Sequence, residues 1–308
     1  MADPTFRSFN HEQGQNYAEH RRGYHHKFYE ILLDRHTSTG GQLDTVLDVG
    51  CGPGMAVRAL APRFAHAIGL DPSEGMTSTA RSLGGTSSTS EPILFHISTA
   101  EDLGANLSPP IPDGSVDLIT AATAAHWFNM SHFWPRAAQV LKPGGSVALW
   151  TTSTIRVDSS VPNCVAIQSA IDNLSAQLTD YMLPGNLLAR GLYTNLPLPW
   201  MLATPVLEFD ETTFWRKEWN TGDESTPEDE IFGAQQPANL DVLEKILGTT
   251  SPVARWREAH PDAVGTEDDL VRITRRDIER SLHEAGVEEG KELLKACVQG
   301  VLLVVKRK

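Results

Sequence analysis

Short apolar runs alternate with amphipathic segments between residues 45 and 152 of this chain. The runs have the length and composition of buried strands, while the segments between them carry apolar residues at helical spacing. The expected strands are 45–49, 66–71, 92–98, 116–122 and 146–152, and the expected helices are 56–64, 76–83 and 132–141. Strands that alternate with helices in this way predict an α/β fold with a doubly wound, mostly parallel sheet and right-handed crossovers.

The rhythm changes on both sides of this core. Residues 28–36 carry apolar positions at helical spacing and predict an N-terminal helix. From about residue 155 a helical pattern leads into a Pro-rich, apolar stretch, which we interpret as an insertion packed over the sheet edge. Residues 208–219 and 297–307 predict strands that bring the sheet to seven, with a helix at 268–286 between them. The predicted parts of the chain are therefore 1–43, 44–154, 155–205 and 206–308.

The composition is that of a folded globular protein, with 40% apolar and 21% charged residues. A net charge of −13 makes nucleic acid an unfavourable partner, because an acidic surface repels the phosphate backbone. The polar N-terminus lacks a secretory signal, and the longest aliphatic run, 301–305, is far shorter than the about 20 residues of a membrane span. We therefore expect a cytoplasmic protein that acts on a small molecule, without a nucleic-acid or membrane partner.

The three cysteines, Cys51, Cys164 and Cys297, lie far apart and form no CxxC pair. They encode neither a disulfide framework nor a structural zinc site. Because no set of His, Asp and Glu has metal-ligand spacing either, we expect no metal.

The strongest local signal is the sequence VLDVGCGPG at residues 46–54. Glycines directly after a buried strand let the backbone turn sharply and approach a ligand without interference from Cβ atoms. Asp71 closes the next expected strand, 21 residues after Gly50, where a carboxylate can accept hydrogen bonds from both hydroxyls of a ribose. The two features predict a nucleotide-like ligand. The dinucleotide fingerprint would need a glycine at Met55, so a nicotinamide oxidoreductase is disfavoured.

The motifs VLDVGCGPG, IGLDPSEGM, STAEDL, PDGSVDLITAA and LKPGGSVAL follow one another between residues 44 and 152. Together they resemble the class I S-adenosylmethionine-dependent methyltransferases, which implies a Rossmann-like fold and S-adenosyl-L-methionine as the cofactor, with S-adenosyl-L-homocysteine as its product. NYAEHRRGYH, AHWFN and EFDETTFWRKEW are similar to small-molecule methyltransferases related to trans-aconitate methyltransferase, especially fungal ones of secondary metabolism. In this family 44–154 would bind the cofactor, 155–205 would cover the substrate, and 1–43 would act as a lid.

The resemblance implies contacts to the methionine and ribose portions of the cofactor. Asp48 would organise the glycine turn near the methionine amine. Alternatively, its carboxylate only accepts hydrogen bonds from amides of the loop. Gly50 and Gly52 would lie against the methionine portion, while Asp71 would bind the ribose hydroxyls.

Further contacts are implied on the adenine side. Pro72 and Met76 stand where the family packs apolar groups against adenine, although Met76 at helical spacing could equally belong to the core. Many relatives carry an aspartate that accepts the adenine amino group at the position that is Thr99 here. This departure leaves Ala100, through its backbone amide, and Glu101, through its carboxylate, as the expected adenine contacts.

The N-terminal segment resembles a lid in which an aromatic side chain and a cation close over the cofactor. Tyr17, Arg22 and Tyr24 are its candidate residues, with Tyr17 and Arg22 as the expected cofactor contacts. A surface helix with solvated charges is the alternative interpretation.

His126 and Trp127 are the candidate catalytic residues. They follow the fourth expected strand, whose carboxyl end borders the crevice where ligands bind in an open parallel sheet. His126 could accept a proton from a thiol or hydroxyl, and Trp127 could shape an apolar wall or face the sulfonium. In the alternative, His126 caps a helix or bonds a core carbonyl and Trp127 belongs to the core.

These observations predict methyl transfer to oxygen or sulfur of a small metabolite. Transfer from a sulfonium is an in-line displacement, so holding the nucleophile and the methyl carbon aligned in a dry site supplies most of the rate. The alternative is a protein that binds the cofactor but acts as an accessory subunit or catalyses a non-methylating reaction.

Overall fold

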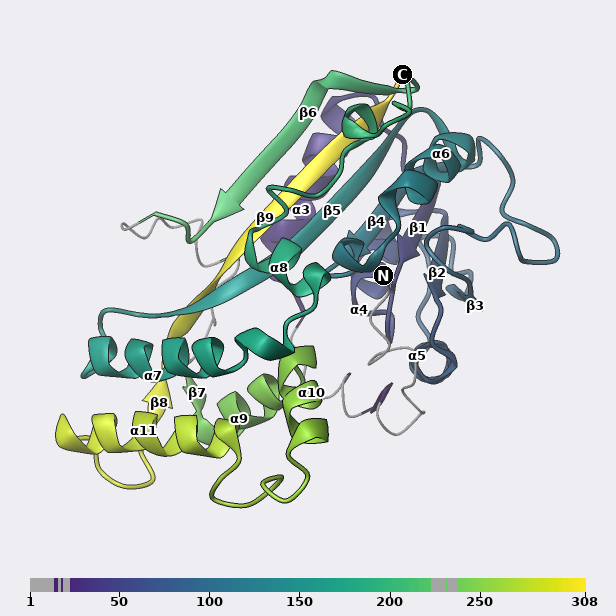
Figure 1. Cartoon of the computed structure of the whole chain (residues 1–308). Helices are drawn as coiled ribbons and strands as arrows, with labels where there is room; N and C mark the ends of the chain where they lie inside the picture. The colour runs from purple at the N-terminus through teal and green to yellow at the C-terminus, as the bar shows by residue number, and fades with distance from the viewer. Residues whose placement is uncertain (1–13, 16–17, 19–22, 223–230, 232–236) are drawn as a thin grey trace. The chain divides into compact units, whose positions relative to one another are not determined.

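The computed structural model describes residues 14–15, 18, 23–222, 231 and 237–308, and its main feature is a seven-stranded sheet (Figure 1). The strand order is β3-β2-β1-β4-β5-β9-β6. The strands are β1 Thr45–Val49, β2 His66–Asp71, β3 Leu94–Ile97, β4 Val116–Ala122, β5 Leu141–Val157, β6 Phe209–Trp219 and β9 Ala296–Arg307. Adjacent strands from β3 to β5 pair in parallel. The predicted α/β fold with a mostly parallel seven-stranded sheet is confirmed.

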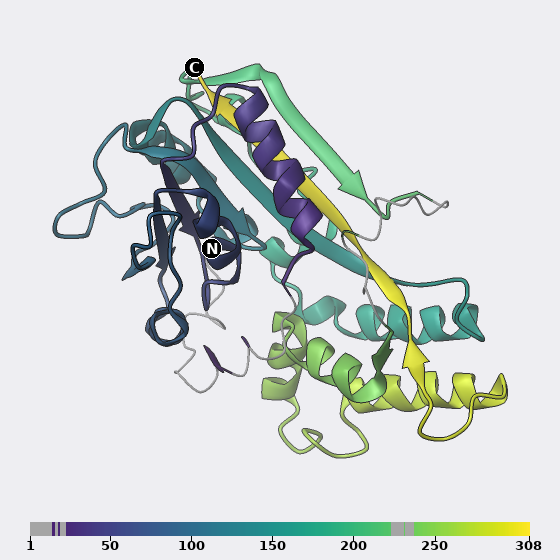
Figure 2. The ribbon, with the colours of Figure 1, turned by 180° about the vertical axis from the view of Figure 1, so that it is seen from behind.

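Helices cover the sheet on both faces. They include α3 His26–Ser38, α4 Met55–Leu60, α5 Glu74–Leu83 and α6 Met130–Val140. Figure 2 shows α3 lying along β5 and β9, and Figure 1 shows α6 on the opposite face. All five residues of β1 are buried, because helices cover the strand on both faces, and three of the five are apolar while Thr45 and Asp48 are polar. This burial explains why the strand is mostly apolar in the sequence.

Helix α3 is fixed to the sheet by polar contacts near its C-terminus. Arg35 Nη2 donates to the carbonyl oxygen of Thr213 in β6 at 2.8 Å. The Nδ1 atom of His36 lies 2.8 Å from the hydroxyl of Ser146 in β5. The expected N-terminal helix is therefore confirmed and packs one face against the sheet.

Strand β5 is longer than the sequence predicted. It runs over Leu141–Val157 and includes the residues Lys142 to Gly145, whose Pro and Gly signal a turn. A register shift in its pairing with β4, between Val116 and Leu118, accommodates these residues within the strand. The Pro and Gly residues predicted a turn before the strand and gave no sign that the strand continues through them.

The chain divides into two compact units. Unit 1 consists of residues 1–152, 188–218 and 300–308, and unit 2 consists of residues 153–187 and 219–299. The segment 155–205, expected as one insertion, is shared between them: residues up to 187 belong to unit 2 and the remainder to unit 1.

Unit 2 has a helical core of its own. Its main helices are α7 Cys164–Gln177, α9 Leu240–Gly248, α10 Ser251–Ala259 and α11 Leu270–Glu284. The short helix α8 Pro184–Arg190 crosses the boundary between the units, and β7 Ala238–Asn239 pairs with β8 Leu293–Leu294 in an antiparallel ladder. Val271, Ile278 and Leu282 line the buried face of α11 at helical spacing. They pack with apolar side chains of α7 and α9 in a single cluster.

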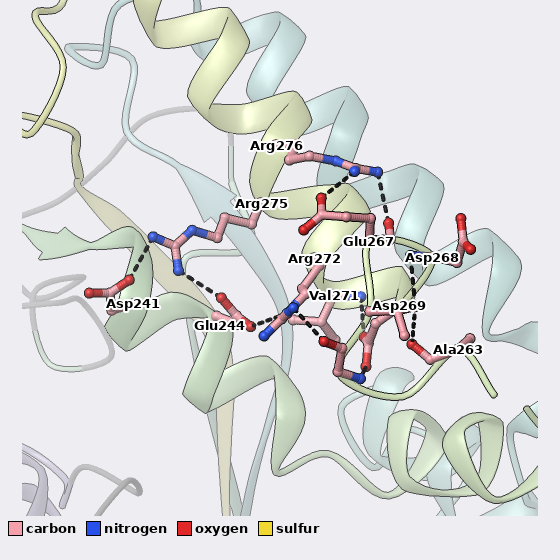
Figure 3. Close-up of polar contacts among 12 residues, drawn as sticks. Asp241, Glu244, Ala263, Glu267, Asp268, Asp269, Val271, Arg272, Arg275 and Arg276 are labelled. Atoms are coloured by element: carbon pink, nitrogen blue, oxygen red, sulfur yellow. Dashed lines mark hydrogen bonds and ion pairs between the residues drawn. The ribbon is translucent and has the colours of Figure 1, made fainter. Parts of the chain in front are cut away.

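A network of charged side chains surrounds the start of α11 (Figure 3). Asp269 is 1% exposed and accepts from the amide of Val271 at 3.0 Å, which caps the helix. Arg257 donates to it through Nε at 2.9 Å and Nη2 at 3.2 Å. Burial alone would raise the pKa of Asp269, but the bonds from Arg257 and Val271 lower it below its usual value. Asp269 therefore joins α10 to α11.

Asp269→Ala is expected to destabilise unit 2 by about 2 kcal/mol, because it removes a helix cap and the charge-assisted hydrogen bonds with Arg257. The loss is limited because Arg257 keeps access to water in the variant. Hydrogen exchange in peptides from α10 and α11, together with urea unfolding, measures the change. Asp268→Ala is the matched control, because this neighbouring side chain is exposed and should alter the stability by less than about 0.5 kcal/mol. Equal exchange rates in the two variants would contradict the capping role.

Candidate functional site

The glycine turn follows β1 and has the geometry that the sequence predicted. Gly50, Gly52 and Gly54 have φ values of +65°, +53° and +84°, in the left-handed region that favours glycine. A Cβ atom at Gly50 would lie 2.6 Å from Cβ of Ala124, so the turn contacts the loop after β4 directly. At Gly52 a Cβ atom would meet no atom of the described residues within 4 Å. The backbone at Gly52 is thus open to the close approach of a ligand.

Asp71 ends β2 beside this turn. Its Oδ2 accepts from the amide of Gly52 at 2.9 Å, and its Oδ1 accepts from the amide of Ser73 at 2.8 Å. The carboxylate therefore ties the glycine turn to the loop that starts α5. Because a carboxylate has about four acceptor positions, it can bind hydroxyl groups of a ligand in addition to two amides.

Asp48 is completely buried in β1. Its Oδ1 accepts from the hydroxyl of Thr120 in β4 at 2.7 Å, whereas its Oδ2 has no hydrogen-bond partner among the described residues. Burial raises the pKa of Asp48 to about 7, the bond from Thr120 and the nearby backbone amide of Val57 lower it in part, and the charge of Asp71 raises it further. An unpartnered carboxylate oxygen in such a place suits a ligand that brings a positive charge or a donor.

The predicted adenine-side residues divide into buried and accessible positions. Met76 is 3% exposed and lies on the buried face of α5, while Pro72 is half-buried directly after Asp71. Ala100 is buried in the core of unit 1. Glu101 is half-buried, and its Oε1 accepts from the amide of Asn129 at 2.8 Å. Glu101 thus joins the loop after β3 to the start of α6.

Thr99 bonds within its own turn. Its hydroxyl donates to Oδ2 of Asp102 at 2.9 Å and accepts from the amide of Asp102 at 3.1 Å. Thr99 thus stabilises the turn after β3.

The loop after β4 brings His126 and Trp127 next to the glycine turn. Both belong to a short 3₁₀ helix, Ala125–Trp127, that follows Thr123, a residue with a left-handed φ of +51°. His126 is 8% exposed and Trp127 is half-buried, with their ring centroids 4.7 Å apart. Because Ala124 contacts Gly50, the candidate catalytic loop and the candidate cofactor loop are adjacent in unit 1.

Two tyrosines complete this region. The phenol oxygen of Tyr193 lies 2.9 Å from Nδ1 of His126, and the phenol oxygen of Tyr24 lies 2.8 Å from the hydroxyl of Thr123. Tyr24 was predicted from the sequence as a lid candidate, whereas Tyr193 was not predicted. No local pattern marks Tyr193, because its contact with His126 spans 67 residues of chain. Tyr17 and Arg22 lie outside the described residues, so their predicted contacts with the cofactor stay predictions.

Outside this site, Glu279, His283 and Glu292 bring their ligand atoms within 4.8 Å of one another. Nε2 of His283 lies 2.7 Å from Oε1 of Glu292, and this bond lowers the pKa of Glu292 below its usual value. This hydrogen bond joins two of the three residues, and the expected absence of a metal stays a prediction.

Residues 47–149 match a protein family described as a methyltransferase domain. A candidate methyltransferase of Dictyostelium discoideum is 31% identical over 146 residues, which cover 47% of this chain and 49% of that protein. Methyltransferase cfoB of Aspergillus candidus is 26% identical over 285 residues, 84% of each chain. The chain thus matches about half the length of the first relative and most of the second.

A solved structure shares the fold over nearly the whole chain. A candidate type II methyltransferase from Anaeromyxobacter dehalogenans superposes with a TM-score of 0.60 at 21% identity, over 94% of this chain and 97% of that one. At this identity the likeness shows the fold alone. Among the described residues, no helix combines the length and the apolar character needed to cross a membrane.

Proposed function

Residues 47–149 are a methyltransferase domain of the class that uses S-adenosyl-L-methionine, and from this premise we propose that the protein methylates oxygen or sulfur of a small metabolite. The enzyme class and the cofactor predicted from the sequence are confirmed at the level of this domain. The acceptor atom and the residues that handle it are our proposal. The observation that carries it is the contact of Gly50 with Ala124, which places the loop of His126 beside the glycine turn.

The residues of the turn fit the cofactor. The open backbone at Gly52 admits a ligand that a Cβ atom would crowd, and Asp71 next to it accepts the ribose hydroxyls. The second oxygen of Asp48 receives the positively charged methionine end. Half-buried Pro72 and the backbone of Ala100 border the adenine. When bound there, the cofactor supplies an activated methyl group on a positively charged sulfur.

His126 acts as the general base. When the acceptor hydroxyl or thiol is methylated, His126 would take the proton that this group loses. The proton passes from His126 to water after transfer. Half-buried Trp127 excludes water from the acceptor and offers a π surface to the positive charge.

The affinity for the cofactor is expected to depend on the ionisation of Asp48. Its pKa of about 7 lies above the ordinary value of 3.8, so ionised Asp48 is scarce below neutral pH. Since a cationic ligand requires the ionised form, affinity for S-adenosylhomocysteine should fall by up to about tenfold per unit below pH 7 and stay level above it. Asp71, Tyr29 and Cys51 are the titratable groups whose charges couple to Asp48.

Calorimetry at a series of pH values measures this dependence, and buffers of different ionisation enthalpy reveal the proton released on binding. Asp48→Asn is the control, because it keeps the shape and abolishes the titration. The same variant should stabilise the empty protein near pH 8. The raised pKa favours folding at low pH, and this contribution is lost as the pH rises through about 7. An affinity for S-adenosylhomocysteine that does not change between pH 5 and pH 8 would contradict the role of Asp48.

One experiment tests the proposed function as a whole. Calorimetry with S-adenosylhomocysteine and with NADH identifies the ligand, and incubation of the protein with methyl-labelled S-adenosylmethionine and a metabolite extract reveals labelled products. We expect S-adenosylhomocysteine to bind, NADH not to bind, and the label to appear on oxygen or sulfur of a small molecule. Cofactor binding without any labelled product would overturn the proposal in favour of an accessory role.

A further inference from the structure

Tyr193 is the buried partner of His126. Its side chain is 2% exposed, its phenol oxygen lies 2.9 Å from Nδ1 of His126, and the two ring centroids are 5.9 Å apart. Thr151 in β5 and the backbone of Ala125 and His126 lie near the phenol oxygen, where they lower the pKa of the phenol in part. Tyr193 therefore links the candidate base to the neighbouring strand of the sheet.

The backbone at Tyr193 has an unusual conformation. Leu192 and Tyr193 have φ values of +50° and +58°, although the left-handed region is unfavourable for residues with a Cβ atom. Surrounding bonds fix this conformation: the amide of Tyr193 donates to the carbonyl of Leu188 at 3.0 Å, and Arg216 Nη2 donates to the carbonyl of Leu192 at 2.7 Å. Such backbone outliers cluster at functional sites. The segment thus holds the phenol in the interior at a cost in free energy.

The direction of the hydrogen bonds follows from the proposed chemistry. Burial raises the pKa of Tyr193 far above its ordinary value, so the phenol keeps its proton. If His126 accepts a proton on Nε2, its neutral ring carries a hydrogen on Nδ1, and that N–H donates to the phenol oxygen.

We propose that Tyr193 is a positioning residue that holds the His126 ring through Nδ1 and keeps the ring proton on that nitrogen. Nε2 is then the basic nitrogen that faces the acceptor. The inference rests on the proposed function, because the choice of nitrogen matters only if His126 transfers a proton.

The first test is nuclear magnetic resonance of the ¹⁵N-labelled histidine rings in the full chain, with the His126 signals assigned through His126→Gln. We expect the Nδ1–H tautomer in the unmodified protein. Tyr193→Phe should give a mixture of tautomers and lower the titration midpoint of this ring by about one pH unit, because the acceptor that stabilises the charged ring is lost. Tyr29→Phe, which removes another buried phenol hydroxyl of unit 1, is the matched control and should change neither.

The second test is the pH dependence of label transfer from methyl-labelled S-adenosylmethionine to the acceptor fraction isolated from the extract. In Tyr193→Phe the acidic limb of the rate profile should move by the same amount as the titration midpoint, while the affinity for S-adenosylhomocysteine stays unchanged. An unaltered tautomer and midpoint, or a rate profile that does not follow the midpoint, would overturn the role of Tyr193. Failure of the proposed function is recognised separately, because the unmodified protein would then transfer no label.

Discussion

Asp71→Ala is expected to weaken S-adenosylhomocysteine binding at least about a hundredfold. The variant loses two hydrogen bonds from ribose hydroxyls to a charged acceptor, each worth about 1.5 to 3 kcal/mol. It also releases the amide of Gly52, which Asp71 holds at 2.9 Å and which keeps the glycine turn next to the ligand. Calorimetry measures the loss of affinity, and circular dichroism shows whether the variant is folded.

Two variants separate the role of Asp71 in binding from its role in the loop. Asp71→Asn retains one carbonyl oxygen of similar shape without the charge, so its affinity should lie between those of the unmodified protein and Asp71→Ala. Ser73→Ala removes the hydroxyl that caps α5 through the amide of Met76, at a cost of about 1 kcal/mol in stability, and should leave binding nearly unchanged. Unchanged affinity in a folded Asp71→Ala protein would refute the ribose assignment.

His126→Ala is expected to lower the turnover rate by about 10² or more, the usual contribution of a positioned general base. The affinity for the cofactor should change little, because the glycine turn contacts Ala124 and not the imidazole. The loss should shrink for acceptors that arrive already ionised, such as a thiol at high pH, because they need no base. Single-turnover rates with labelled cofactor measure the chemical step separately from binding and release.

His132→Ala provides the matched control for this variant. His132 is exposed on α6, six residues after His126, and its removal should leave both the rate and the stability unaltered. If His126→Ala instead loses stability or cofactor affinity in proportion to activity, His126 has a structural role and the enzyme relies on alignment alone.

The sequence by itself determined the strands, the glycine turn and the acid of β2. β1 and β4 are buried on both faces, so their sequences are mostly apolar whatever the partners are. The left-handed φ values of Gly50 and Gly52 follow from a short-range requirement for glycine after the strand. Asp71 could be found because its distance from the turn along the chain is set by one strand–helix–strand unit.

Only the tertiary structure decided which groups meet. Asp48 bonds Thr120 across 72 residues, and His126 meets Tyr193 across 67, because neighbouring strands and the loops after them come from distant parts of the chain. The division of the segment 155–205 between two units could not be predicted from the sequence either. Apolar residues at helical spacing indicate that a helix buries one face, but they do not indicate the hydrophobic core against which that face packs. Periodicity records local burial, whereas the pairing of side chains depends on long-range packing.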